Sequence, residues 1–281
     1  MSSNKVKANN INFYYETDGE QQNVIFLHGM GDNSQMWWNQ IKPFVVSYRY
    51  LMPDMRGSGK TDKAKGDYTV DLMGQDMSEW WRYGKMQIAQ DQETADQLQA
   101  INTVPVWVGY SMGGRVALQV AAMHPEYFKG LILVSSGIGL NKPAPEAMKR
   151  REDMIALLQK NDMKKWAEMA TDAAFSPGFK QKNPKAWEQY MKAKLQQKNE
   201  GVLGQMKGMA GAPAPDLAKV KFPVLFIVGQ NDQGFGPEQA KQVQAALPNS
   251  KVVVLPTGHA SPIEAPEQFN KTVMDFIGTL K

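Results

Sequence analysis

Six short apolar runs, each bounded by turn residues, limit the fold of this chain more than any other feature. The runs are Asn23–His28, Tyr48–Met52, Val104–Gly109, Gly130–Ser135, Val224–Gly229 and Lys251–Leu255. Nearly continuous apolar runs of this length are typical of strands that are buried on both faces, as in a parallel sheet. Stretches with helical periodicity separate them, such as residues 112–123, where Val116 and Val120 share one face. This alternation predicts an α/β fold with a doubly wound, mostly parallel sheet.

Three segments depart from the alternation. Near the N-terminus, Val6 and Phe13 lie in stretches that alternate with polar neighbours, which is typical of an antiparallel hairpin at a sheet edge. The long segment Asp62–Thr103, with its Trp-Trp pair, predicts an additional helix or lid element. Between residues 141 and 216 only helical patterns occur, so we expect a helical lid there. The predicted domains are a core of residues 1–140 and 217–281 and a helical cap of residues 141–216.

The composition narrows the functions to be considered. Lys and Arg total 32, Asp and Glu total 28, and this net charge of +4 is too small to predict binding to nucleic acid or to an anionic membrane. The chain has no cysteine and no histidine pair at ligand spacing, so we expect neither a metal site nor a cofactor. Gly57–Thr61 looks like the end of a phosphate-binding loop, but Asp54 stands where that motif has glycine. No apolar run approaches about 18 residues and no apolar signal region opens the chain, so we expect no membrane span and a cytoplasmic location.

The sharpest chemical signal is Gly109-Tyr-Ser-Met-Gly113, which follows a predicted buried strand and precedes a predicted helix. This is the context of a nucleophile elbow, in which a serine stands on a strained turn above the end of the strand. Residues without a Cβ are needed two positions before and after the serine, because strand and helix approach closely there. The motif therefore predicts Ser111 as a nucleophile.

A serine nucleophile needs a base, and the chain has three histidines. His124 closes the helix after the elbow, at the other end of the sheet, and is predicted to be structural. His28 ends a strand at the same edge as Ser111 and is the competing candidate, but it precedes the serine. His259 follows the last predicted strand, as the order serine, acid, histidine requires, and is the predicted base.

The base in turn needs a carboxylate that orients it. Asp232 lies three residues after the predicted strand Val224–Gly229, at the same edge of the sheet. The strand before the helical insertion ends in Ser135-Ser-Gly and offers no acid, and Asp54 is predicted to hold a loop. Asp232 is therefore expected to fix the imidazole tautomer and to stabilise the imidazolium.

Acyl chemistry also requires donors for a tetrahedral oxyanion. The N–H of Met112 follows the nucleophile at the start of a helix, whose dipole favours negative charge. A second donor is expected from the glycine-rich loop His28-Gly-Met-Gly31, and we predict the N–H of Met30.

With these motifs in this order, the chain resembles the α/β-hydrolase superfamily over nearly its whole length. The resemblance rests on His28-Gly-Met-Gly31, Pro53-Asp-Met-Arg-Gly-Ser-Gly59, Gly109-Tyr-Ser-Met-Gly113, Gly229-Gln-Asn-Asp232 and Gly258-His259 followed by Glu264 and Pro266. It implies an α/β-hydrolase fold with an eight-stranded, mostly parallel sheet, a helical cap after the sixth strand and Ser-His-Asp chemistry. Related haloalkane dehalogenases and epoxide hydrolases carry an aspartate at the elbow, so Ser111 argues against both.

The leading hypothesis is a serine hydrolase, a carboxylesterase or lactonase that cleaves a small carboxylic ester or lactone through an acyl-enzyme. The elbow is also similar to that of the menaquinone-pathway synthase, a non-hydrolytic member in which an arginine after the elbow helps to hold a carboxylated substrate. A signal receptor with vestigial catalysis is a third possibility. The predicted substrate contacts are Gly29, Tyr110, Arg115, which matches that arginine, and Trp166 in the cap.

Overall fold

The computed structural model describes residues 2–90, 103–140 and 145–281. Its strands are β1 (Ser2–Ala8), β2 (Ile11–Asp18), β3 (Asn23–Leu27), β4 (Arg49–Pro53), β5 (Val106–Tyr110), β6 (Gly130–Val134), β7 (Val224–Gly229) and β8 (Ser250–Leu255). They form one eight-stranded sheet in the order β1-β2-β4-β3-β5-β6-β7-β8. β1 pairs with β2 and β2 with β4 in antiparallel register, and the remaining neighbours are parallel. The edge hairpin is confirmed, and β3 to β7 are buried throughout, as expected. The expectation is wrong for β8, which forms the other edge of the sheet and is buried only at its two ends, with Val254 45% exposed.

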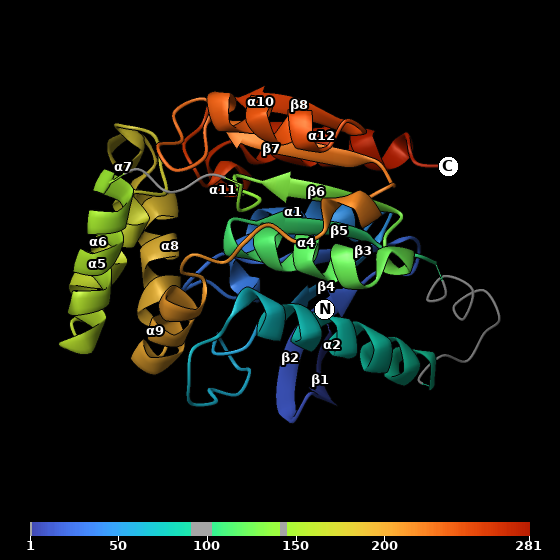
Figure 1. The fold of residues 1–281 in the computed structure, drawn as a ribbon, viewed down its shortest axis with the longest axis horizontal. Coiled ribbons are helices and arrows are strands. Elements are labelled where there is room, and N and C mark those ends of the chain that lie inside the picture. The colour runs from blue at the N-terminus through green and yellow to red at the C-terminus, as the bar shows by residue number, and fades with distance from the viewer. Residues whose placement is uncertain (1, 91–102, 141–144) are drawn as a thin grey trace.

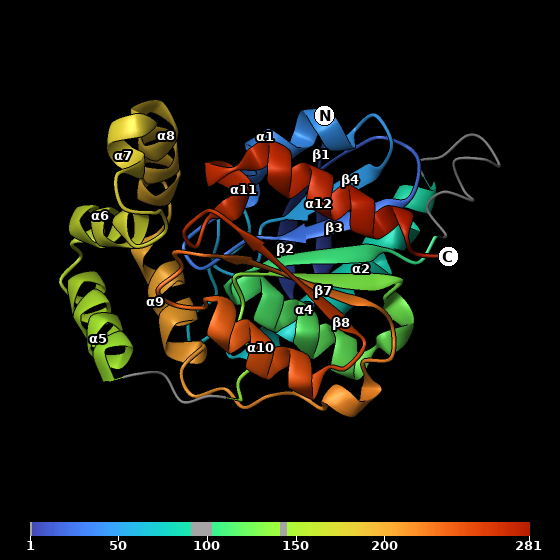
Figure 2. The same cartoon turned by 90° about the horizontal axis from the view of Figure 1, so that it is seen from above.

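Helices cover both faces of this sheet (Figures 1 and 2). The α-helices are α1 (Trp38–Phe44), α2 (Val70–Gln90), α4 (Met112–Met123), α5 (Pro145–Gln159), α6 (Met163–Asp172), α7 (Phe179–Lys182), α8 (Pro184–Leu195), α9 (Asn199–Gly208), α10 (Pro237–Ala246), α11 (Ser261–Glu264) and α12 (Pro266–Gly278). Single 3-10 turns are η1 (Ser34–Trp37), η2 (Pro125–Tyr127) and η3 (Leu217–Lys219). α1 and α12 lie on one face of the sheet, and α2, α4 and α10 lie on the other. Within the described residues, no helix combines the length and the apolar character needed to cross a membrane.

The sheet separates two buried cores, and β3 contributes to both. Ile25 and Leu27 join the cluster beneath α2 and α4, whereas Val24 and Phe26 join the cluster beneath α1 and α12. Successive strand residues point to opposite faces, so a strand covered on both sides must be apolar throughout. The apolar run of β3 thus has its explanation in the two helical layers.

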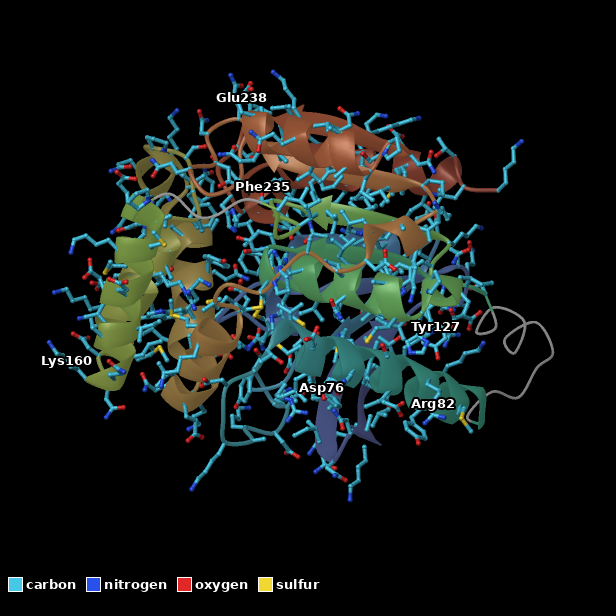
Figure 3. The ribbon with its side chains drawn as sticks, in the orientation of Figure 1. Asp76, Arg82, Tyr127, Lys160, Phe235 and Glu238 are labelled. Carbon is cyan, nitrogen blue, oxygen red and sulfur yellow. The ribbon has the colours of Figure 1, made fainter. Side chains whose placement is uncertain are left out.

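Between β6 and β7 the chain leaves the sheet and forms α5–α9, which we call the cap helices. They lie beside the carboxyl ends of the parallel strands, at the left of Figure 1. Figure 3 shows Lys160 among them, at the end of the molecule opposite Arg82. Their apolar residues Trp166 and Met206 belong to the same buried cluster as Phe26 of β3. A helical cap after the sixth strand is confirmed, while the exact domain limits stay a prediction, because residues 141–144 lie outside the described part.

α2 occupies much of the long segment for which the sequence predicts a helix or a lid element. It packs on α4 and on β1. Trp80 and Trp81 are buried, and the ring of Trp80 meets that of Tyr15 edge-on with 5.6 Å between centroids. α2 is therefore an additional helix that covers the sheet, and residues 91–102 of the segment lie outside the described part.

Candidate functional site

Ser111 stands on a sharp turn between β5 and α4. Its φ of 52° and ψ of −113° lie outside the regions that residues with a Cβ ordinarily adopt. The turn is possible because its neighbours are glycines: a Cβ on Gly109 would lie 2.5 Å from the Cα of Gly114, and one on Gly113 would lie 2.6 Å from the carbonyl oxygen of His28. The turn places the serine at the carboxyl edge of the sheet, as expected of an elbow.

Three side chains predicted from the sequence meet at this edge in a continuous chain of hydrogen bonds. The Oγ of Ser111 lies 2.9 Å from Nε2 of His259, and Nδ1 of His259 lies 2.8 Å from Oδ2 of Asp232. Because a carboxylate only accepts hydrogen bonds, Nδ1 carries the proton in the neutral ring and Nε2 is left to accept from the serine hydroxyl. The imidazole is therefore oriented to take the serine proton.

Asp232 is held as a buried carboxylate. Its Oδ1 accepts hydrogen bonds from the backbone N–H groups of Gly234 at 2.8 Å and Phe235 at 3.0 Å. Burial alone would raise the pKa of Asp232, but the charge and hydrogen bond of His259 and the two backbone donors outweigh it and hold the pKa below its usual value. The group is consequently ionised at neutral pH.

The loop that carries His259 is fastened by a second carboxylate and by the cap. Oε2 of Glu264 accepts from the N–H of Gly258 at 2.9 Å and from the N–H of Ser176 at 3.1 Å. The N–H of Ala260 donates to the carbonyl oxygen of Ala174 at 2.8 Å. Backbone bonds on both sides of His259 thus fix its position, and two of them involve the segment that joins the cap helices α6 and α7.

The backbone groups predicted as oxyanion donors lie on neighbouring strand ends. Met112 is the first residue of α4, and the first N–H groups of a helix have no acceptor within it. Met30 lies in the loop after β3, which pairs with β5 in parallel register, so both loops leave the same edge. Ser136 donates its hydroxyl proton to the carbonyl oxygen of Ser111 at 2.8 Å and so fixes the peptide that contains the Met112 N–H.

Tyr110, Gly29 and Trp166, predicted as substrate contacts, lie close to the site. The ring of Tyr110 packs beside the imidazole of His259 with 5.2 Å between centroids, and burial raises the pKa of this phenol well above its usual value. A Cβ on Gly29 would lie 2.7 Å from the Tyr110 ring, so glycine makes room for it. Trp166 is 1% exposed and packs against Gly31, next to Met30. Their contacts with substrate stay predictions.

Arg115, the fourth predicted substrate contact, is engaged elsewhere. Its guanidinium donates to the carbonyl oxygens of Ala212 at 2.8 Å and Pro213 at 3.0 Å, in the connection from the cap back to the core. These bonds favour a structural role, and a contact with substrate stays a prediction.

His28, His124 and Asp54, the alternatives to His259 and Asp232, form hydrogen bonds with other groups. His28 is fully buried and accepts a hydrogen bond at Nε2 from the N–H of Met55 at 2.9 Å. The carboxylate of Asp54 accepts from the backbone of Ser34 and Lys60 and so ties two loops together. His124 ends α4 and lies 3.0 Å from Glu126.

Sequence reasoning missed the residues that support this site. They are Asp32, Lys194 and Gln205, which surround the Met30 loop, and Glu264, which the sequence offers only as part of a motif. Asp32 directly follows the motif His28-Gly-Met-Gly31, and this position in the sequence could have identified it as a supporting residue. The pattern around Lys194 and Gln205 is that of ordinary amphipathic helices and offers none.

Comparisons with known proteins agree with the fold. A family model described as "alpha/beta hydrolase fold" matches residues 22–266. The chain is 26% identical over 269 residues to 3-oxoadipate enol-lactonase 2 of Acinetobacter baylyi, covering 95% of this chain and 93% of that protein. It is 25% identical over 265 residues to a Bacillus subtilis protein provisionally named 2-succinyl-6-hydroxy-2,4-cyclohexadiene-1-carboxylate synthase, covering 92% and 90%. A thermophilic esterase from Thermogutta terrifontis has the same fold, with a TM-score of 0.85 at 24% identity and coverage of 100% and 99%.

Proposed function

Because the chain belongs to the α/β hydrolase family, we propose that it is a serine hydrolase of small carboxylic esters or lactones. The observation that carries the proposal is the chain of hydrogen bonds from Ser111 through His259 to Asp232. The similarity to an enol-lactonase supports a lactone or ester substrate. Residues 141–216 are proposed to form a cap domain over this site.

In the first half-reaction, Nε2 of His259 accepts the hydroxyl proton while Oγ of Ser111 bonds to the substrate carbonyl carbon. The carbonyl oxygen gains negative charge and accepts hydrogen bonds from the N–H groups of Met30 and Met112. Asp232 stabilises the imidazolium through Nδ1 and keeps its own carboxylate ionised. The intermediate collapses when the imidazolium gives its proton to the leaving alkoxide, which departs as the alcohol and leaves an acyl group on the serine.

In the second half-reaction, water takes the place of the alcohol. His259 accepts a proton from this water as the hydroxide equivalent attacks the acyl carbon, and the same two N–H groups hold the oxyanion. Ser111 leaves with the proton from the imidazolium, so the enzyme returns to its starting state and the acid is released. The overall reaction consumes one water and requires no cofactor.

Covalent labelling and turnover test this proposal together. We expect a fluorophosphonate to label Ser111 and short-to-medium p-nitrophenyl esters to be hydrolysed. Ser111→Ala should abolish labelling and lower kcat by about 10⁴-fold or more. Ser47→Ala, at an exposed serine just before the start of β4 and so at the edge of the sheet opposite Ser111, is the matched control and should leave both unchanged.

Two results would contradict the proposal. One is the absence of turnover above background on a panel of esters and lactones of varied chain length. The other is an active or still labelled Ser111→Ala enzyme, which would remove the serine from the chemistry.

A further inference from the structure

Cap side chains hold both polar atoms of the peptide that joins Met30 to Gly31. Nζ of Lys194, on α8, donates to the carbonyl oxygen of Met30 at 3.3 Å. Oε1 of Gln205, on α9, accepts from the N–H of Gly31 at 3.0 Å. Lys194 is 3% exposed and Gln205 is fully buried, so neither bond can be exchanged for one to water without moving the cap.

Lys194 is itself fixed by a buried carboxylate in the same loop. Its Nζ lies 2.7 Å from Oδ1 of Asp32, and the hydroxyl of Tyr190 donates to Oδ2 of Asp32 at 3.1 Å. The side chain of Asp32 is 2% exposed. Because each charge is buried against the other, the ammonium of Lys194 is committed to this loop and is not a free cation for a substrate carboxylate.

The amide of Gln205 is oriented by partners on its other side. Its Nε2 donates to the carbonyl oxygen of Arg56 at 3.1 Å and to Oγ of Ser58 at 2.7 Å. A backbone carbonyl only accepts, so Nε2 must face Arg56 and Oε1 must face Gly31. The position of the Gly31 N–H is therefore set by a side chain with one allowed orientation.

We propose that Lys194 and Gln205 are positioning residues of the oxyanion hole: by fixing the Met30–Gly31 peptide they set the orientation of the adjoining Gly29–Met30 peptide, whose Met30 N–H faces the substrate oxygen. The inference rests on the proposed function, because only acyl chemistry places an oxyanion there. The Gly29–Met30 peptide is held at its carbonyl oxygen by Nδ1 of His28 at 2.8 Å and the N–H of Asp32 at 3.2 Å. The bonds from the cap fix the next peptide, where Gly31 has a φ of 65° and glycine allows many backbone conformations. A displacement of a reacting group by about 1 Å can lower a rate by about 100-fold.

Gln205→Met tests the proposal, because it keeps the length of the side chain and removes the acceptor for the Gly31 N–H. The matched control is Gln197→Met: Gln197 is also a buried cap glutamine, but it accepts from the N–H of Gly59, at 2.9 Å, in a different loop. On a p-nitrophenyl ester we expect Gln205→Met to lower kcat by about 10- to 100-fold with KM within about threefold. An alkylboronic acid, which forms a tetrahedral adduct on the serine, should bind more weakly by a similar factor. The control should change each quantity by less than about twofold.

A second variant covers the case in which Gln205→Met does not fold. Asp32→Asn combined with Lys194→Met removes the bond to the Met30 carbonyl without leaving a lone buried charge, and the same loss in kcat and boronate affinity is expected. The inference fails if Gln205→Met and Gln197→Met behave alike, or if kcat falls while boronate affinity is unchanged. In both cases the wild-type enzyme still hydrolyses esters, whereas failure of the proposed function would show as a wild-type protein without turnover.

Discussion

Asp232→Asn distinguishes two roles for the buried carboxylate. Either it fixes the proton of His259 on Nδ1, or it only strengthens one hydrogen bond to that ring. The asparagine oxygen can keep the hydrogen bonds from Gly234 and Phe235, and the amide NH₂ then faces Nδ1 of His259. Two donors cannot share one hydrogen bond, so the imidazole must move its proton to Nε2, where it points at Ser111. The base is then unable to accept the serine proton.

The size of the loss in kcat distinguishes a reversed imidazole tautomer from the loss of a single hydrogen bond. Loss of one charge-assisted hydrogen bond is worth about 1.5–3 kcal/mol, or roughly 10- to 150-fold in rate. A reversed tautomer is expected to cost about 10⁴-fold in kcat, which is about 5.4 kcal/mol. The structure favours the larger value, because the two backbone donors on Oδ1 dictate which atom of the asparagine faces His259.

Steady-state kinetics on a p-nitrophenyl ester measures this difference. Glu238→Gln is the matched control, since it also removes a carboxylate near β7, from a side chain that is 78% exposed and paired with Lys241. Glu238 lies on the outer surface of α10 (Figure 3), and kcat should change by less than about twofold. A loss below about 100-fold for Asp232→Asn, with an unchanged melting temperature, would refute the tautomer argument.

Two further predictions concern stability. Gly113→Ala sets a methyl group against the carbonyl oxygens of Leu27 and His28. We expect it to lower the free energy of unfolding by about 3 kcal/mol or more and to abolish turnover. A calorimetric melting temperature equal to that of the wild type would contradict the close approach of strand and helix. Burial lowers the pKa of His28, whose Nε2 accepts from Met55, so the unfolded chain binds a proton first as the pH falls. Stability in urea should therefore decline below about pH 6.5 with an added slope of up to about 1.4 kcal/mol per pH unit, which His28→Gln lacks; equal slopes would disprove it.

Most of the sheet could be predicted because burial on both faces leaves an unmistakable pattern. β3, β6 and β7 coincide closely with their apolar runs, since every residue in them faces one helical layer or the other. β5 begins at Val106, two residues after the apolar run does, because Pro105 has no N–H for the ladder. The pair Trp80-Trp81 was harder to interpret, because large aromatic residues serve a lid as well as a core. Only the packing of α2 on β1 shows that this pair belongs to the core and not to a lid.

The proposed chemistry could be predicted from residues that lie at strand ends. Ser111, Asp232 and His259 follow different strands, and parallel strands bring their carboxyl ends to one edge of the sheet. Chain order and spacing were therefore sufficient to predict that these three side chains meet. The cap residues that support the Met30 loop lie on helices, and no comparable rule of chain order or spacing predicts them. Gln205 lies 174 positions from its partner Gly31, and an amphipathic helix tolerates a glutamine or lysine at many positions without any bond to the core.

The cap meets the site at two places, one on each side of Ser111. The segment between α6 and α7 bonds to the loop of His259, through Ala174, and α8 and α9 bond to the loop of Met30. The bonds of Ala174, Gln205 and Lys194 are made to backbone atoms of these loops, so they fix the positions of the proposed base and of a proposed oxyanion donor. A cap that only covered the substrate would influence KM. A cap attached in this way should influence kcat, because it places two groups whose alignment matters most in the transition state.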